Sequence, residues 1–103
     1  MNTFKVTGQY LMWRRSLADH KVRAHVQRRL YQARNGNFGE WKSAGAGVLE
    51  MKIDIGSGYR IYYAREGKTV YVLLVGGDKS SQRRDIALAK ALWRQLKETA
   101  HGT

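Results

Sequence analysis

The sequence predicts a small α+β fold with one small antiparallel sheet: a first strand, two helices, a three-strand meander and a C-terminal helix. Three observations support this prediction. A chain of 103 residues with 43% hydrophobic content can bury one compact core, which places residues 1–103 in one domain. Apolar residues recur at helical spacing near both ends of the chain and alternate with polar residues between them. Short glycine-containing turns separate the alternating segments.

The first third of the chain begins with a strand over residues 3–6 and a helix over residues 9–17. The apolar side chains at helical spacing in this helix are Tyr10, Trp13 and Leu17. A second helix follows over residues 20–34, where Asp19 can cap the first turn. Its apolar stripe contains Val22, Val26, Leu30 and Ala33. Its opposite face is basic, is interpreted as solvated, and contains Lys21, His25, Arg28 and Arg29.

Residues 35–47 are rich in glycine, and we expect a structured loop that Phe38 and Trp41 pin to the core. After the loop we expect an antiparallel meander, because short turns separate three alternating or apolar segments. Its three strands span residues 48–55, 59–65 and 69–75. The last helix begins near Ser80. Its apolar stripe contains Ile86, Ala89, Trp93 and Leu96.

The period of two in the meander assigns its side chains to faces. The apolar face of strand 48–55 is expected to meet the two helices, which leaves the other face open. That open face gathers Glu50, Lys52, Asp54, Arg60 and Tyr62. These residues suit either of two roles: binding a polyanion, or pairing the two cations with the carboxylates as part of the structure.

The segment GGDKSSQ, residues 76–82, is expected to leave the sheet as a loop. Its glycines would let the backbone amides of residues 78–81 approach a phosphate at the start of the last helix. The alternative is that Gly76 and Gly77 only form a tight exit from the strand.

The composition limits the function classes. A formal charge of +11 predicts a polyanionic partner, with nucleic acid as the default. Because the chain has no cysteine and its three histidines show no metal spacing, we expect no disulfide, no metal and no cofactor. The longest apolar run, residues 70–75, is far too short for a membrane span, so a cytoplasmic location without membrane contact is expected.

The order of elements, together with YRIYY and GGDKSSQRRDIALAKALW, resembles the RelE/ParE toxin superfamily of type II toxin-antitoxin modules, in its HigB-like branch of addiction module killer proteins. The resemblance covers nearly the whole chain and implies a RelE-like fold. It implies an mRNA interferase that cleaves message in the ribosome without a metal, arrests growth, and is neutralised by a cognate helix-turn-helix antitoxin encoded next to it. The strand arginine of the family corresponds to Arg60, and the basic residue of the preceding strand corresponds to Lys52.

Cleavage by a 2′-hydroxyl needs cations for the phosphorane, a base and an acid. Arg60 and Lys52 suit the first task, and Lys79 suits an adjacent phosphate or the acid. The base is Glu50 or Asp78. The predicted RNA-binding residues are Tyr62, Ser80, Gln82 and Arg83. Two other functions stay open: a ParE-like inhibitor of DNA gyrase, and a nucleic-acid-binding domain without catalysis.

Overall fold

The computed structural model describes residues 1–101, and residues 102 and 103 of the predicted domain lie outside the described part. The fold is α+β, with a five-stranded mixed sheet in the order β1-β5-β4-β3-β2 and a long C-terminal helix. The strands are β1 (Thr3–Val6), β2 (Trp41–Gly45), β3 (Val48–Ile53), β4 (Tyr59–Arg65) and β5 (Val70–Asp78). The helices are α1 (Gly8–Ser16), α2 (His20–Arg34), the 3₁₀ helix η1 (Lys79–Ser81) and α3 (Gln82–His101).

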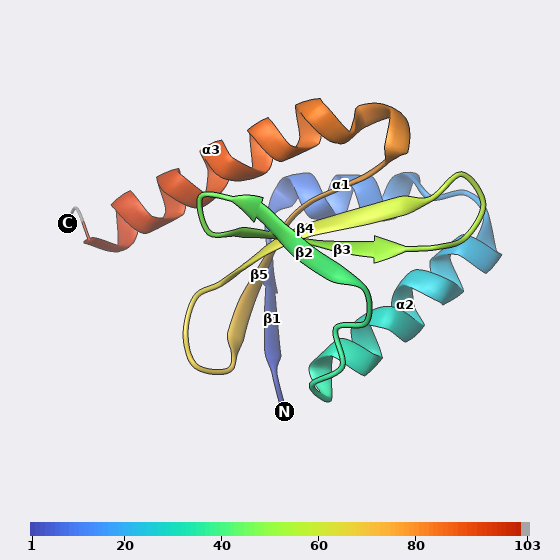
Figure 1. The fold of residues 1–103 in the computed structure, drawn as a ribbon, viewed down its shortest axis with the longest axis horizontal. Helices are drawn as coiled ribbons and strands as arrows, with labels where there is room; N and C mark the ends of the chain where they lie inside the picture. The colour runs from blue at the N-terminus through green and yellow to red at the C-terminus, as the bar shows by residue number, and fades with distance from the viewer. Residues whose placement is uncertain (102–103) are drawn as a thin grey trace.

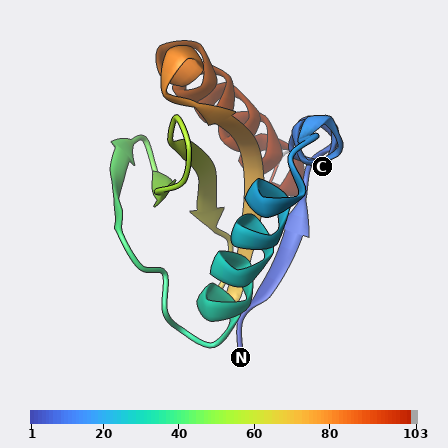
Figure 2. The same ribbon diagram turned by 90° about the vertical axis from the view of Figure 1, so that its right-hand side faces the viewer.

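Helices cover both faces of the sheet. In Figure 1, α3 crosses above the strands and α2 lies below them, and Figure 2 shows the sheet between these helices from the side. Two core clusters result. One joins α1 and α2 to the sheet around Val26, Met51 and Tyr63, and the other joins α3 to the opposite face around Tyr62 and Trp93. The sheet is therefore the middle layer of three.

The sequence predicted α2 correctly. The helix spans the expected residues 20–34, and the Asp19 side chain accepts a hydrogen bond from the backbone N–H of Lys21. The predicted apolar stripe is buried or half-buried. Two residues of the predicted solvated face, His25 and Arg29, are half-buried, and Arg29 donates to the carbonyl oxygens of Lys52 and Phe38, at 2.6 and 3.0 Å. Arg29 thus ties the helix to β3 and to the segment before β2.

The prediction of an antiparallel sheet was wrong at one edge. β1 pairs with β5 in parallel, with Thr3 opposite Val70, and the helices and strands between them in the chain form the long crossover connection that parallel neighbours need. The prediction of a loop over residues 35–47 was also wrong in part. Residues 41–45 form β2, which pairs with β3 and puts Lys42 opposite Glu50. The sequence did not show this strand because glycines lie close to it on both sides, at residues 39, 45 and 47, and glycine lowers strand propensity.

The face assignments within the meander are confirmed. Met51, Ile61 and Tyr63 belong to the cluster under α1 and α2, whereas Val48 and Tyr62 belong to the cluster under α3. The expectation that the second face stays open was wrong, because α3 packs on it. α3 buries Ala89 and Trp93 of the predicted stripe there, while Leu96 remains 38% exposed.

The strand β5 is longer than predicted and contains Gly76, Gly77 and Asp78, which pair with Ile61, Arg60 and Tyr59. Both glycines permit close packing. A Cβ at Gly76 would overlap the indole ring of Trp13 in α1. A Cβ at Gly77 would overlap the Asp85 carboxylate and stand 2.8 Å from Ser81 Oγ. Helices on opposite faces therefore approach the same stretch of backbone.

Replacing Gly77 by alanine is expected to lower the free energy of unfolding by about 1–3 kcal/mol, because the methyl group would push Asp85 and Ser81 away from β5. For a domain of this size, that loss lowers the Tm by roughly 4–8 °C per kcal/mol. Thermal unfolding followed by circular dichroism measures the change. Gly67→Ala is the matched control, since its Cβ would meet only Val70 Cβ at 3.9 Å. Equal Tm values for the two variants would contradict this account of the glycine.

Candidate functional site

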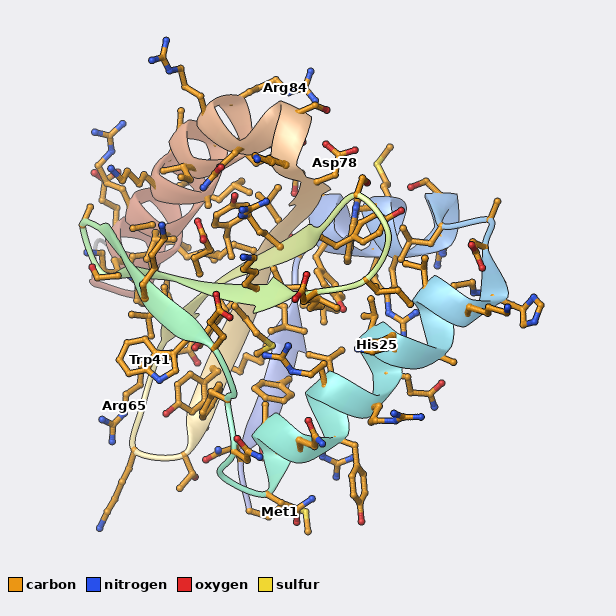
Figure 3. The ribbon with its side chains drawn as sticks, turned by 45° about the vertical axis from the view of Figure 1, so that its right-hand side comes forward. Met1, His25, Trp41, Arg65, Asp78 and Arg84 are labelled. Atoms are coloured by element: carbon orange, nitrogen blue, oxygen red, sulfur yellow. The ribbon has the colours of Figure 1, made fainter. Side chains whose placement is uncertain are left out.

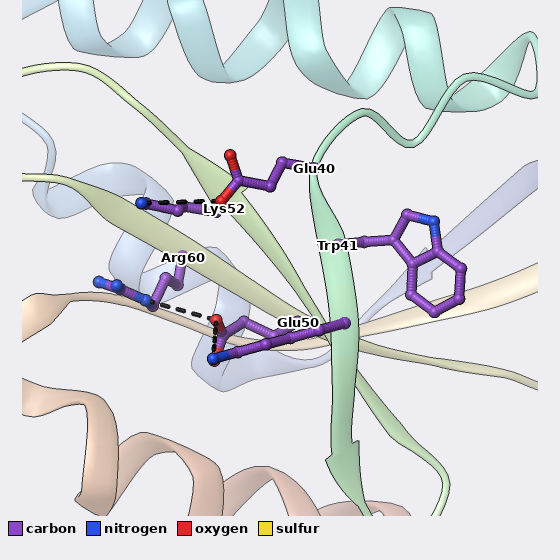
Figure 4. Close-up of a pocket in the computed structure, with 6 residues that line it drawn as sticks. Glu40, Trp41, Glu50, Lys52 and Arg60 are labelled. Atoms are coloured by element: carbon purple, nitrogen blue, oxygen red, sulfur yellow. Dashed lines mark ion pairs between the residues drawn. The ribbon is translucent and has the colours of Figure 1, made fainter.

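A polar hollow lies where β2, β3 and β4 run side by side. Its volume is about 200 Å³, and Figure 4 shows its side chains. The lining residues are Glu40, Trp41, Lys42, Glu50, Lys52 and Arg60. The cross-strand register brings them together, since Lys42 lies opposite Glu50 and Lys52 lies opposite Arg60. Side chains on directly opposite residues of neighbouring strands are within contact distance.

Arg60 is the most constrained cation of this hollow. It is only 9% exposed, and its Nε lies 3.5 Å from Glu50 Oε2. Its Nε and Nη1 have no hydrogen-bond partner within residues 1–101. A buried guanidinium with unfilled donors is costly unless an acceptor completes it. Both nitrogen atoms are buried, so an incoming anion would meet them only after the Arg60 side chain moved toward the hollow.

Glu50 is the carboxylate beneath this cation. It is 3% exposed and accepts a hydrogen bond from Gln82 Nε2 at 3.2 Å, while Lys42 Nζ stands 3.9 Å from its Oε2. Two cations and an amide thus surround one buried carboxylate. This arrangement fixes the carboxylate and, through it, the Arg60 side chain.

Lys52 and Glu40 lie at the more exposed side of the hollow. Lys52 Nζ is 3.7 Å from Glu40 Oε2, and their side chains are 38% and 69% exposed. An ion pair this exposed contributes little to stability. Its two members are therefore free to exchange partners with a ligand. With Lys42 and Arg60, the hollow holds three cations against two carboxylates.

Tyr62 does not face solvent as the sequence suggested. It is 0% exposed beneath α3, and its hydroxyl has no hydrogen-bond partner in the described part of the chain. Burial, and then the negative charge of Glu50, raises the pKa of Tyr62. A ring in this position cannot stack on a base, so the predicted RNA contact at Tyr62 is wrong for this conformation.

The predicted phosphate loop is not a loop with free amides. Gly76, Gly77 and Asp78 belong to β5, and the Asp78 carboxylate accepts the backbone N–H groups of Ser80 and Ser81 at 2.9 and 3.3 Å. The side-chain hydrogen bond from Ser80 lowers the pKa of Asp78. Asp78 therefore caps η1, which leaves its oxygen atoms poorly placed to take a proton from a substrate.

The other residues predicted around this segment divide into two groups. Gln82 reaches the hollow through its hydrogen bond to Glu50. Lys79 and Ser80 in η1 and Arg83 in α3 are exposed and are not part of the described lining. Nearby, Asp85 is 6% exposed and accepts a hydrogen bond from Ser81 Oγ at 2.5 Å. Asp85 was not predicted, because its burial depends on contact between α3 and β5.

Sequence reasoning also missed Glu40, Trp41 and Lys42. Trp41 was expected to pin a loop to the core, yet it is 54% exposed on the edge strand β2. The alternation of Trp41, Lys42 and Ser43 was a usable signal, because an edge strand often alternates exposed charged and apolar residues.

Among the described residues, no group of three or more His, Cys, Asp or Glu side chains is placed to hold a metal ion. The side chain of His101, one of the three histidines considered in the sequence, lies outside the described part. No helix in the described range has the length and apolar character needed to cross a membrane.

The chain is similar to a known protein over almost its full length. A protein of Haemophilus influenzae, described as uncharacterized, is 38% identical over 92 residues, which cover 89% of this chain and 93% of the relative. No family model matches the chain.

Proposed function

The chain belongs to one family with the Haemophilus influenzae protein, and we propose that it acts as the toxin of a type II toxin-antitoxin module, with a RelE/ParE-like fold of the HigB-like branch. Its proposed activity is cleavage of messenger RNA on the ribosome by attack of a 2′-hydroxyl group. Its proposed partners are the ribosome, the message, and a cognate antitoxin encoded beside it.

One observation carries this proposal: the Arg60 guanidinium lines a hollow together with Lys42 and Lys52, so that three cations meet at one cross-strand site. A phosphorane carries its charge on several equatorial oxygen atoms. A planar guanidinium can donate to two of them at once, whereas an ammonium acts as a point charge. The net charge of +11 adds long-range attraction for RNA.

The proposed reaction takes place at one phosphodiester. The 2′-oxygen loses its proton and forms a bond to phosphorus, the bond from phosphorus to the 5′-oxygen breaks, and the leaving 5′-oxygen takes a proton from water. The products are a 2′,3′-cyclic phosphate and a 5′-hydroxyl. Arg60 donates to the phosphorane oxygens, and Lys42 and Lys52 add positive charge around them. Of the two predicted bases, Glu50 lines the hollow whereas Asp78 caps η1. Glu50 is 3% exposed and held by Arg60, Lys42 and Gln82, so these contacts must open before it accepts the 2′-hydroxyl proton.

The test is expression of this chain alone from an inducible promoter. We expect growth arrest with cleaved messages, because ribosome-bound RNA would be cut while the antitoxin is absent. Fragment ends are mapped after the purified chain is incubated with programmed ribosomes. Growth without arrest, together with uncut message in that assay, would contradict the proposal. Arrest with intact message and inhibited DNA supercoiling would assign the chain to the gyrase-inhibitor alternative.

A further inference from the structure

A second hollow lies on the other side of β2 from Arg60. It encloses about 220 Å³, and four of its six lining residues are aromatic. The lining consists of Phe38, Trp41, Leu49, Tyr63, Arg65 and Tyr71. Figure 3 shows Trp41 and Arg65 at the same end of the molecule, remote from His25 on α2. Trp41 is the residue that borders both hollows.

Trp41 contributes little to the core. At 54% exposure, its indole leaves much of its apolar area in water, which a folding role alone does not explain. Figure 4 shows its ring projecting from β2 on the side away from Glu50 and Arg60. The register agrees, because Trp41 lies opposite Met51 while Lys42 lies opposite Glu50, and successive side chains of a strand point to opposite faces.

The hollow behind Trp41 is lined mainly by aromatic rings, with one cation at its side. The Phe38 ring stacks on Tyr63 with centroids 5.4 Å apart and planes at 5°, and it contacts Tyr71 at 5.0 Å. Arg65 closes one side, where its Nε and Nη2 donate to the carbonyl oxygens of Gly67 and Lys68, each at 3.0 Å. A flat cation held in place beside aromatic rings suits a planar, electron-rich ligand.

We propose that this aromatic hollow is a nucleobase subsite in which Trp41 stacks on a base next to the phosphate bound at Arg60. This inference rests on the proposed function. Residues 41 and 42 are neighbours on opposite faces of the edge strand β2. A single strand of RNA that crosses this edge can place a phosphate beside Lys42 and the adjoining base beside Trp41. Stacking accepts any base, so Trp41 provides affinity for single-stranded RNA without selecting a sequence.

The experiment measures binding of two single-stranded probes of equal length and phosphate number, one with bases and one abasic. Every sugar of both probes carries a 2′-O-methyl group, which removes the nucleophile and prevents cleavage. We expect Trp41→Ala to weaken binding of the base-containing probe by about 5- to 150-fold and to leave the abasic probe unaffected. Trp41→Phe, which keeps an aromatic face, should lose less.

Two comparisons make the result specific. Tyr31→Ala is the matched control, because Tyr31 is an exposed aromatic residue on α2, 67% exposed and outside the described lining of both hollows. Lys42→Ala should weaken both probes alike and reduce the salt dependence of binding, since it removes a phosphate contact. Thermal unfolding of each variant verifies that the fold is retained.

The outcomes separate this inference from the proposed function. Message cleavage by a Trp41→Ala variant that binds both probes as tightly as the unmodified chain would overturn the base subsite and leave the toxin assignment standing. Equal weakening of both probes would also overturn it, because Trp41 would then act through phosphate binding or the fold. A chain that binds neither probe and does not arrest growth would overturn both proposals.

Discussion

Arg60→Lys is expected to lower the rate of message cleavage by about 10²–10³-fold while the protein stays folded. Lysine keeps a positive charge beside the buried Glu50, so the carboxylate retains a partner. It lacks the planar pair of N–H donors that would contact the phosphorane oxygens. The measurement is single-turnover cleavage on programmed ribosomes, with thermal unfolding of the same preparation.

Two other variants are needed to interpret the cleavage rate of Arg60→Lys. Arg60→Ala should lose activity and also up to about 3–5 kcal/mol of folding free energy, since it leaves Glu50 as a buried charge without its guanidinium. This stability cost follows from burial, which the sequence did not predict. Lys21→Ala on α2 is the control, because it removes one exposed positive charge far from the hollow in sequence and outside its described lining. Wild-type cleavage by folded Arg60→Lys would remove Arg60 from the proposed site.

A message with a single 2′-deoxynucleotide at the cleavage position is expected to remain uncut there. The proposed reaction uses the 2′-oxygen as its nucleophile, and deoxyribose has none, so the loss should be complete within detection. The 5′ fragment of the unmodified message should end in a 2′,3′-cyclic phosphate, which mass spectrometry identifies.

The control for this substitution is the same deoxynucleotide one codon away, where cleavage at the original position should continue. Cleavage of the modified position, or a 5′ fragment that ends in a 3′-hydroxyl, would contradict 2′-hydroxyl attack. Neither result would bear on growth arrest, so this experiment tests the cleavage reaction separately from the toxin assignment.

The candidate site was partly visible in the sequence. Strand alternation placed Glu50, Lys52 and Arg60 on one face, and the structure brings these three together. The role of Gln82 near them was predicted as an RNA contact, whereas its amide holds Glu50. Asp78 was a candidate base, and it is a cap. Such roles depend on which atoms meet across elements that are distant in the chain, and periodicity carries no information about this.

The sequence by itself determined most of the local elements, though not β2, and the two faces of β3 and β4. α2 and β4 have the predicted bounds, because a cap at Asp19 and a period of two over residues 59–65 are set by neighbouring residues. Only the tertiary structure decided that α3 covers the Tyr62 face, that β1 joins β5 in parallel, and that β2 completes the hollow beside Arg60. The first two depend on packing between segments far apart in sequence, whereas β2 pairs with β3, the next strand along the chain, and meets Arg60 of β4 only across the sheet. Local spacing determines which side chains share a face, and long-range packing determines what covers that face.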